Sequence, residues 1–360
     1  MVFLNISIRQ IFLLFVAASF SLAVRVTPEL NAAIAGQAGW VSVILSCLIY
    51  TVMIIFLARL FKNQNNLDLY GLFNKVLGRF LCNALTTVYA LWIFILLSMH
   101  LRSAAERYMT AFFPAAPLSF FVISLLAICF IILQGKFACF VKMGEIAFYL
   151  ILAALFIVFT VAVHQIKFEN FLPVTTMDAM PVVKGIYTLL GVLSIFTFVL
   201  FAGDEFADKD KFKRYGLQSG AVLTVINIAI FLLTVGIFGS NLTQRFTLPF
   251  LMAEKSIKFF GSIERMESLD MLAWLISDVL VIGLLAYILI SIISKMTGIK
   301  NKTALKSPIL LGAYIFSLFI VKNIFEIKLF AQYIELYMNI VFGLAIPVAV
   351  FMIGKMRGRV

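Results

Sequence analysis

Asp278 is the residue with the clearest chemical potential, because it is an acid inside an otherwise apolar stretch that begins near residue 271. At a rise of 1.5 Å per residue, a helix that enters an apolar layer at 271 carries this carboxyl group about 10 Å below its surface. A carboxylate at that depth costs a few kcal/mol unless it meets a cation, a donor or water. The position therefore indicates either a site for a cation, a ligand amine or a proton, or a structural pair with Arg25, Arg102 or Arg107.

The apolar run 81–102 ends in a short charged segment and carries two aromatic residues near its middle. The i, i+4 spacing of Arg102 and Glu106 predicts an ion pair on a helix surface, and a solvated helix end is the simplest interpretation of these charges and of Arg107. Tyr89 and Trp92 lie one turn apart on this helix. They would form either one wall of a ligand pocket or ordinary packing, which the pattern favours.

Small and hydroxylated residues gather at mid-depth in two other apolar runs, 9–27 and 183–203. Such residues let a helix unwind and present backbone groups to a ligand, although they also allow close packing between helices. The termini of the half-helices would then carry partial charges that complement the carboxylate and amine of an amino acid. The complete set of candidate ligand-binding residues is Ser19, Ser21, Leu22, Tyr89, Trp92, Gly191, Ser194, Thr197 and Asp278.

Composition identifies the elements that must position these residues. The 360 residues are 63% hydrophobic and only 13% charged, about half the charge of a soluble domain. A soluble fold of this size cannot bury so much apolar surface, so we expect a single all-α polytopic membrane domain over 1–360. Because a span needs roughly 20 apolar residues, the sequence predicts ten transmembrane helices at 9–27, 38–60, 81–102, 118–135, 144–164, 183–203, 216–238, 271–294, 308–324 and 330–353.

The basic residues indicate the orientation of these spans. Most of the 29 Lys and Arg residues fall in the loops and ends that lie on one side of the predicted helices, which places both termini in the cytoplasm. The net charge of +12 is then an orientation signal and an attraction to anionic lipid, and not a nucleic-acid footprint. Ten spans with both termini on one side also divide into two halves of five with opposite orientation, as in an inverted repeat.

Catalytic and metal-binding signatures are missing from the sequence. It contains two histidines and four scattered cysteines with no metal-ligand spacing, and no motif of a hydrolase, metalloprotease or nucleotide-binding enzyme. We therefore expect no enzyme, no metal and no cofactor. The segment 240–268 faces outward between two spans, and its mixed apolar and charged pattern predicts one or two amphipathic helices over the outer mouth, with Pro249 at a helix start.

The same outer segment resembles the signature of the spore germination permease family. The resemblance rests on Thr247–Phe250, on Ser262–Glu267 with Glu264 and Arg265, and on Trp274. Further landmarks extend it over the chain: Arg9-Gln10, Gly39-Trp40-Val41, Leu77-Gly78-Arg79 and Asn170–Pro173. The sequence departs from the family in the first span, where the glycine-containing break is replaced by the glycine-free stretch 19–23. Pro249, Glu264, Arg265 and Trp274 are the family-signature residues, with a structural or coupling role.

The resemblance implies the fold of the amino acid–polyamine–organocation transporters, with a five-plus-five inverted repeat and broken helices 1 and 6. It also implies a membrane subunit of a nutrient germinant receptor, located in the bacterial cell membrane or inner spore membrane, that works with an A-type subunit and a lipoprotein C-type subunit. The ligand would be a small nutrient, such as an amino acid. Two alternatives stay open: a proton- or cation-coupled amino acid transporter with Asp278 as the coupling site, and a structural scaffold for the partner subunits.

Overall fold

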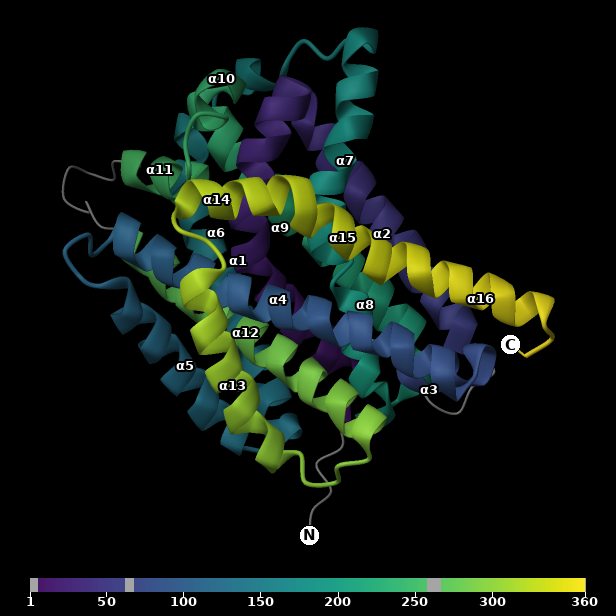
Figure 1. Cartoon of the computed structure of the whole chain (residues 1–360). Coiled ribbons are helices and arrows are strands. Elements are labelled where there is room, and N and C mark those ends of the chain that lie inside the picture. Colours follow the sequence, from purple (N-terminus) through teal and green to yellow (C-terminus); the bar gives the residue numbers. More distant parts are fainter. Residues whose placement is uncertain (1–5, 62–67, 258–266, 360) are drawn as a thin grey trace.

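The computed structural model describes residues 6–61, 68–257 and 267–359 and is a bundle of α-helices (Figure 1). Side chains between 267 and 270 are not described. The α-helices are α1 (Ile8–Ala35), α2 (Gly39–Phe61), α3 (Leu69–Leu77), α4 (Arg79–Ala111), α5 (Leu118–Gln134), α6 (Phe137–Ala162), α7 (Ala179–Leu193), α8 (Phe196–Val199), α9 (Phe212–Phe238), α10 (Ser240–Thr243), α11 (Pro249–Ser256), α12 (Glu267–Thr297), α13 (Thr303–Phe319), α14 (Ile324–Phe330), α15 (Leu336–Ile340) and α16 (Ile346–Met356).

Shorter elements link or continue these helices. Six are 3₁₀ turns: η1 (Gly36–Ala38), η2 (Val163–Gln165), η3 (Phe168–Phe171), η4 (Thr176–Asp178), η5 (Leu200–Glu205) and η6 (Lys209–Lys211). Two are π-helical turns, η7 (Ala331–Glu335) and η8 (Val341–Ala345), which join α14, α15 and α16 into one helical rod. A two-residue parallel pair, β1 (Ile6–Ser7) with β2 (Phe206–Ala207), ties the start of α1 to the end of η5.

Among the residues that the structure describes, seven helical stretches are long and apolar enough to cross a membrane, judged by length and composition. The first, Ile8–Phe61, contains two of the predicted spans, and the shorter apolar helices α5 and α13 lie where two others were predicted. Large hydrophobic side chains such as Phe80, Phe156 and Phe319 are exposed on the outside of the bundle, as on a lipid-facing surface. The chain is therefore an all-α integral membrane protein.

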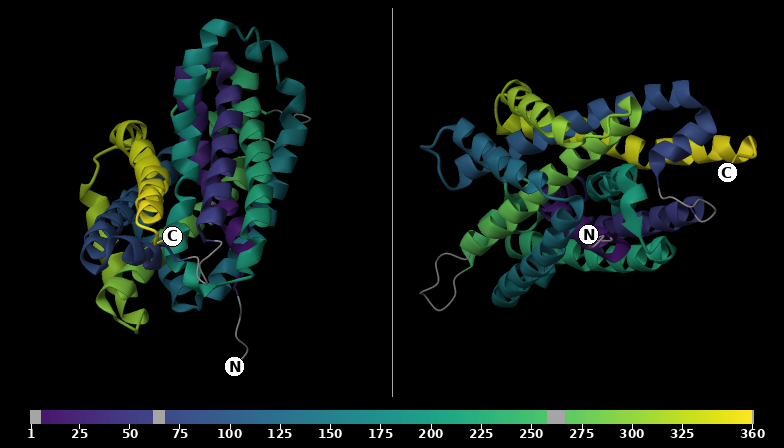
Figure 2. Two further views of the ribbon diagram at one scale, coloured as in Figure 1. Left: turned by 90° about the vertical axis from the view of Figure 1, so that its right-hand side faces the viewer. Right: turned by 90° about the horizontal axis from the view of Figure 1, so that it is seen from below.

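Helix α1 is the central element of the bundle. It packs against α6, α7, α9 and α12, and α2 packs against α7 and α9 on one side of it (Figure 1). Helix α4 crosses α12 and contacts α5 and α13, and the rod that begins with α14 runs beside α4 and touches α7 through α15 (Figure 2). Residues on α1 can therefore meet residues from α4, from α12 and from the last rod.

The structure corrects the predicted end of the first span. Helix α1 has no break between Ser19 and Ala23 and continues through Arg25 and Pro28 to Ala35. The missing N–H of Pro28 is tolerated because neighbouring helices bury this turn, including Thr27 and Leu30. The polar residues that suggested a helix end are paired inside the protein instead of facing water.

The sixth predicted span does contain an interruption. Helix α7 ends at Leu193, Ser194 and Ile195 form a turn, and the short α8 and the 3₁₀ turn η5 continue toward Glu205. The break therefore falls at the small residues that the sequence singled out in this span.

Candidate functional site

The most prominent polar feature of the interior is an ion pair between α4 and α12. Arg107 places Nη2 2.7 Å from Oδ1 and 2.6 Å from Oδ2 of Asp278, and the Tyr108 hydroxyl donates to Oδ2 at 2.9 Å. Both members of the pair are only 3% exposed. Of the three partners that the sequence left open for Asp278, the structure selects Arg107.

Helix geometry explains this pairing. Trp274 lies one turn before Asp278 on α12, and the Arg107 guanidinium carbon lies 4.9 Å from its ring centroid. The aromatic face and the carboxylate thus bind one guanidinium from the same side of one helix, and a cation–π contact gains strength when it is removed from water. The family-signature residue Trp274 is therefore part of the charged site.

A second buried pair joins α1 to the π-helical turn η7. Arg25 donates from Nη2 to both carboxylate oxygens of Glu335, at 3.0 and 3.1 Å, and from Nη1 to Ser103 Oγ on α4 at 3.0 Å. His100 Nε2 lies 3.7 Å from the same carboxylate. The extra residue of a π turn changes the direction of the following side chains, and such turns are frequent at functional sites. Three elements thus meet at Arg25.

Two further charge pairs lie near these. Glu29, one turn after Arg25 on α1, pairs with Lys328 of α14. Arg102 and Glu106 form the predicted i, i+4 pair at 3.2 Å. The expectation of a solvated helix end for that pair is wrong, because both side chains are buried and Arg102 also donates to the Lys322 carbonyl at 3.0 Å. The end of α4 is covered by the chain before α14.

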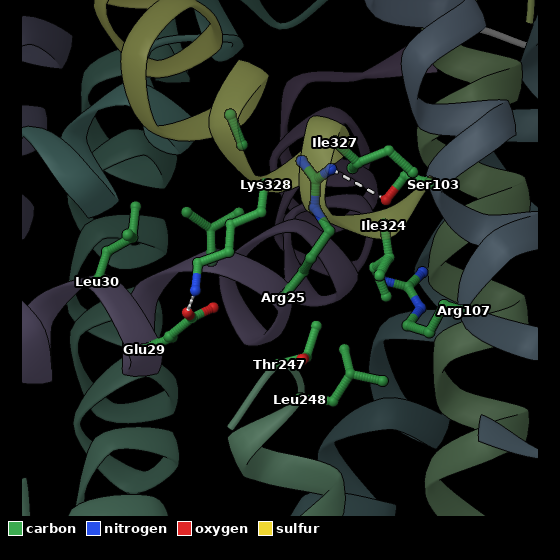
Figure 3. A pocket seen from close by; sticks show the side chains of 12 residues that line it. Arg25, Glu29, Leu30, Ser103, Arg107, Thr247, Leu248, Ile324, Ile327 and Lys328 are labelled. Carbon is green, nitrogen blue, oxygen red and sulfur yellow. Dashed lines mark hydrogen bonds and ion pairs between the residues drawn. The ribbon is translucent and has the colours of Figure 1, made fainter. Parts of the chain in front are cut away.

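A cavity of about 40 Å³ opens between these groups (Figure 3). Arg25 stands in the middle of the view, with Glu29 and Lys328 on one side and Ser103 and Arg107 on the other (Figure 3). The remaining lining is mostly apolar and comes from α1, from the segment before α11 and from the last rod: Val26, Leu30, Thr247, Leu248, Ile324, Ile327 and Ala331. The cavity therefore combines cations, one carboxylate and an apolar wall.

The glycine-free stretch of α1 makes an unusual contact with α12. The Ser277 hydroxyl accepts from the Ser21 N–H at 2.9 Å and donates to the Ala17 carbonyl at 2.7 Å. A side chain is thus inserted where the helix would otherwise form its own backbone bond, a recognised cause of local helix distortion. Ser277 precedes Asp278 in the chain, so this stretch of α1 is connected directly to the helix that carries the buried acid.

Several other candidate residues pack against the last rod. The Tyr89 hydroxyl donates to the Phe342 carbonyl at 2.6 Å, and Trp92 Nε1 donates to Asn339 Oδ1 at 3.0 Å. A Cβ added at Gly191 would lie 2.7 Å from the Leu336 carbonyl oxygen, so only glycine allows this approach. These contacts occupy the region in which Tyr89 and Trp92 would line a ligand pocket.

The hydroxyl groups near the helix interruption are also occupied. Ser194 donates to the Leu190 carbonyl at 2.7 Å, Ser19 donates to the Val16 carbonyl at 2.9 Å, and Thr197 contacts the Met53 sulfur at 3.7 Å. Leu22 is buried in the core of α1. The structure therefore separates Asp278 and its charged partners from Tyr89, Trp92, Gly191 and Ser194, which contact α15 and η8.

The family-signature residues are only partly described. Helix α11 begins at Pro249, as predicted, and Trp274 is buried beside Arg107. Glu264 and Arg265 lie outside the described residues. Within the described part of the chain, no group of three or more His, Cys, Asp or Glu side chains is arranged to hold a metal ion.

Sequence reasoning missed three members of the charged site: Glu29, Lys328 and Glu335. Glu335 is an acid inside the predicted span 330–353, so the depth argument applied to Asp278 would also have selected it. Glu29 was overlooked because the first span was ended before it. Nothing local marks Lys328, since its role depends on contact with a helix about 300 residues earlier.

Comparisons with known proteins identify the family. The family model described as "Spore germination protein" matches residues 5–327. Among curated proteins, spore germination protein KB of Bacillus subtilis (strain 168) is 22% identical over 99% of this chain and 96% of its own length. Spore germination protein GerQB of Bacillus cereus is 23% identical over 88% of this chain and 85% of its own, and the putative spore germination protein YfkT of Bacillus subtilis (strain 168) is 24% identical over 96% and 95%. The family match includes Arg25, Arg107, Trp274 and Asp278, and it ends before Lys328 and Glu335. The chain belongs to the spore germination protein family of integral membrane proteins.

Proposed function

We propose that this protein is the membrane subunit of a nutrient germinant receptor, which binds a small amino acid and passes the signal to its partner subunits. The family match over most of the chain supports a role in spore germination. The observation that carries the proposal is the set of ion pairs that joins α1, α4, α12 and the last rod beside one cavity. A small ligand in this cavity would contact α1, α4 and the last rod, and would reach α12 through the Arg107–Asp278 pair.

Ten spans in a five-plus-five arrangement, with both termini on the cytoplasmic side, form the architectural part of this proposal. Seven apolar helical stretches among the described residues, one of them long enough for two spans, and the shorter helices α5 and α13 are compatible with this number. The interruption between α7 and α8 supports a broken sixth helix, and the Ser277 contact with Ser21 and Ala17 supports a local distortion in the first. The end of the bundle that carries α10 and α11 then faces outward.

Binding would act by changing which of two arrangements is stable. A ligand shifts such an equilibrium only through different affinity for the two states. In the described arrangement Gly191, Ser194, Tyr89 and Trp92 contact the last rod. Access of a ligand to the candidate residues of α1 and α7 would require this rod to move away, and that movement is the signal that the partner subunits would receive.

The partners in this proposal are an A-type subunit and a lipoprotein C-type subunit in the inner spore membrane, with membrane lipid around the apolar surface. Two curated relatives of similar length are named as spore germination proteins KB and GerQB, which agrees with a shared role. Exposed apolar side chains on α5, α6 and α13 offer surface for lipid or for these subunits.

The second candidate is an amino acid transporter with Asp278 as its coupling site. The helix interruption at Ser194 favours it, since transporters bind substrate and ions at such breaks. The engagement of Asp278 by Arg107 and Tyr108 favours the receptor, because these residues satisfy the carboxylate without a proton or metal ion.

Germination of spores that lack this chain tests the proposal. The measurement is the loss of optical density of heat-activated spores exposed to each of the 20 amino acids, in a strain that also lacks paralogous subunits. We expect loss of the response to at least one amino acid, restored by the gene in trans. An unchanged response to every amino acid would contradict the receptor function.

A further inference from the structure

We propose that the cavity between α1, α4 and α14 is a recognition site for the charged head of a small zwitterionic amino acid, separate from the candidate residues at the α7 interruption. The inference rests on the proposed function, since it names the place where the nutrient first binds. Its ligand class follows from the charges that line the cavity, from the apolar wall beside them and from the small volume.

The carboxylate of the ligand is received by guanidinium groups. Arg25 and Arg107 both line the cavity, and their side chains come from α1 and α4 (Figure 3). Arg25 has five N–H donors, of which its contacts to Ser103 and Glu335 use only part. Planar guanidinium groups bind carboxylates with two parallel hydrogen bonds, and desolvated pairs of this kind are strong. Glu335 accepts two hydrogen bonds from Arg25, which fixes the orientation of the guanidinium group.

The ammonium group of the ligand is received by Glu29. This side chain is buried at the cavity wall, whereas its partner Lys328 is 37% exposed. Lys328 also has a flexible four-carbon stem, so its ammonium group can move into water while Glu29 stays fixed. The ligand therefore exchanges one ammonium group for another at Glu29, and no buried carboxylate is left unpaired.

The sum of charges disfavours an anionic ligand. The cations Arg25, Arg107 and Lys328 are paired with the acids Glu29, Asp278 and Glu335, and movement of Lys328 into water removes one positive charge. A ligand that brings its own ammonium group replaces this charge at Glu29, whereas an anion without one would leave Glu29 unpaired in a site shielded from water.

The volume restricts the side chain of the ligand. A cavity of about 40 Å³ is small, so the ligand must be among the smallest amino acids even when the Lys328 ammonium group has moved out. The apolar wall from Leu248, Ile324 and Ile327 suits a short aliphatic side chain and offers little to a polar one. Glycine and alanine satisfy both conditions, and valine tests the upper limit of size.

Both charged ends of the ligand would contact α1, because Arg25 and Glu29 are four residues apart on one helix face. Arg107 adds α4, and the release of Lys328 removes the ion pair between α14 and α1, one of the two that join α1 to the last rod. Binding would thus replace a direct link between α1 and the last rod. The loss of this link makes it easier for the rod, which contacts Gly191 and Ser194, to move when the ligand binds.

The test is equilibrium binding of glycine, L-alanine and L-valine to the purified full-length chain in detergent, by isothermal titration calorimetry. N-acetyl-L-alanine lacks the ammonium group and L-alaninamide lacks the carboxylate, so both should bind at least about thirty-fold more weakly than L-alanine. Glu29→Gln should weaken L-alanine binding by a similar factor and abolish the discrimination against N-acetyl-L-alanine. Glu326→Gln, the same change on α14 at a residue outside the cavity lining, is the matched control and should leave affinity unchanged.

Lys328→Met provides a second test, in which the affinity for L-alanine should rise and not fall. Removing the ammonium group that competes for Glu29 should tighten L-alanine binding, a result that loss of folding cannot imitate. If the wild-type chain binds amino acids but neither Glu29→Gln nor Lys328→Met changes the affinity, the cavity is not the site and the proposed function stands. If none of the 20 amino acids binds the wild-type chain, the proposed function fails together with this inference.

Discussion

Replacement of Asp278 by asparagine tests whether the buried pair with Arg107 holds α4 and α12 together. The carboxylate accepts from Arg107 and Tyr108 over distances of 2.6–2.9 Å, in an interior where both charged side chains are at most 5% exposed. Removing one partner of a buried pair typically costs about 3–5 kcal/mol. Asparagine keeps an oxygen that can accept from Tyr108, so we expect the lower end, about 3 kcal/mol.

The assay is thermal unfolding of the purified chain in detergent, followed by tryptophan fluorescence and circular dichroism. At roughly 2 °C per kcal/mol for a larger domain, Asp278→Asn should lower Tm by about 6 °C. Asp210→Asn is the matched control, because Asp210 is exposed and its replacement should change the free energy of unfolding by less than about 0.5 kcal/mol.

A double-mutant cycle with Arg107→Gln separates the pair from general disruption. If the two side chains interact as described, the double variant should be less destabilised than the sum of the single variants, by about 1–3 kcal/mol. A Tm for Asp278→Asn equal to that of Asp210→Asn, or strictly additive effects in the cycle, would refute the reasoning.

Three further predictions concern other contacts in the bundle. Gly343→Ala should destabilise the chain by about 1–3 kcal/mol, because its Cβ would clash with the Ser194 carbonyl oxygen. Gly312→Ala is the control, since its Cβ meets only ordinary contacts of 3.4 Å or more, and thermal unfolding measures both. Lys295→Met should cost about 1–2 kcal/mol, since its ammonium group bonds two carboxylates and one carbonyl at 2.6–2.8 Å, and Lys300→Met, at an exposed position, should be neutral by the same measurement. Ser277→Ala should cost about 1 kcal/mol and accelerate amide hydrogen exchange in the stretch of α1 that it contacts; unchanged exchange there would contradict the insertion of its hydroxyl.

The positions of the helices could be predicted well from the sequence, and their ends could not. Apolar runs long enough to span a membrane are a strong signal, and each predicted run overlaps helical structure, although 183–203 and 330–353 each extend over several helical segments. The end of the first run was misplaced because Arg25 and Pro28 look like a helix terminus. In the structure, Arg25 is paired with Glu335 inside the bundle, which removes the need for water at that point.

The candidate site shows the same division. The depth of Asp278 could be deduced from its place in the chain, and its partner could be narrowed to three arginines. Selecting Arg107 required the crossing of α4 and α12, and finding Lys328 beside Glu29 required the packing of the last rod on α1. Contacts between residues so far apart in sequence have no local pattern that predicts them. Glu335, in contrast, could have been found from the sequence, because it is an acid inside an apolar run.

Uptake and binding of labelled amino acids by proteoliposomes that contain the purified chain test the central claim most directly. The measurement compares vesicles with and without an imposed pH gradient, and with Asp278→Asn as the variant of the proposed coupling site. The receptor function predicts saturable binding of a small amino acid with no accumulation inside the vesicles. Accumulation that depends on the gradient and disappears in Asp278→Asn would contradict it and establish a transporter.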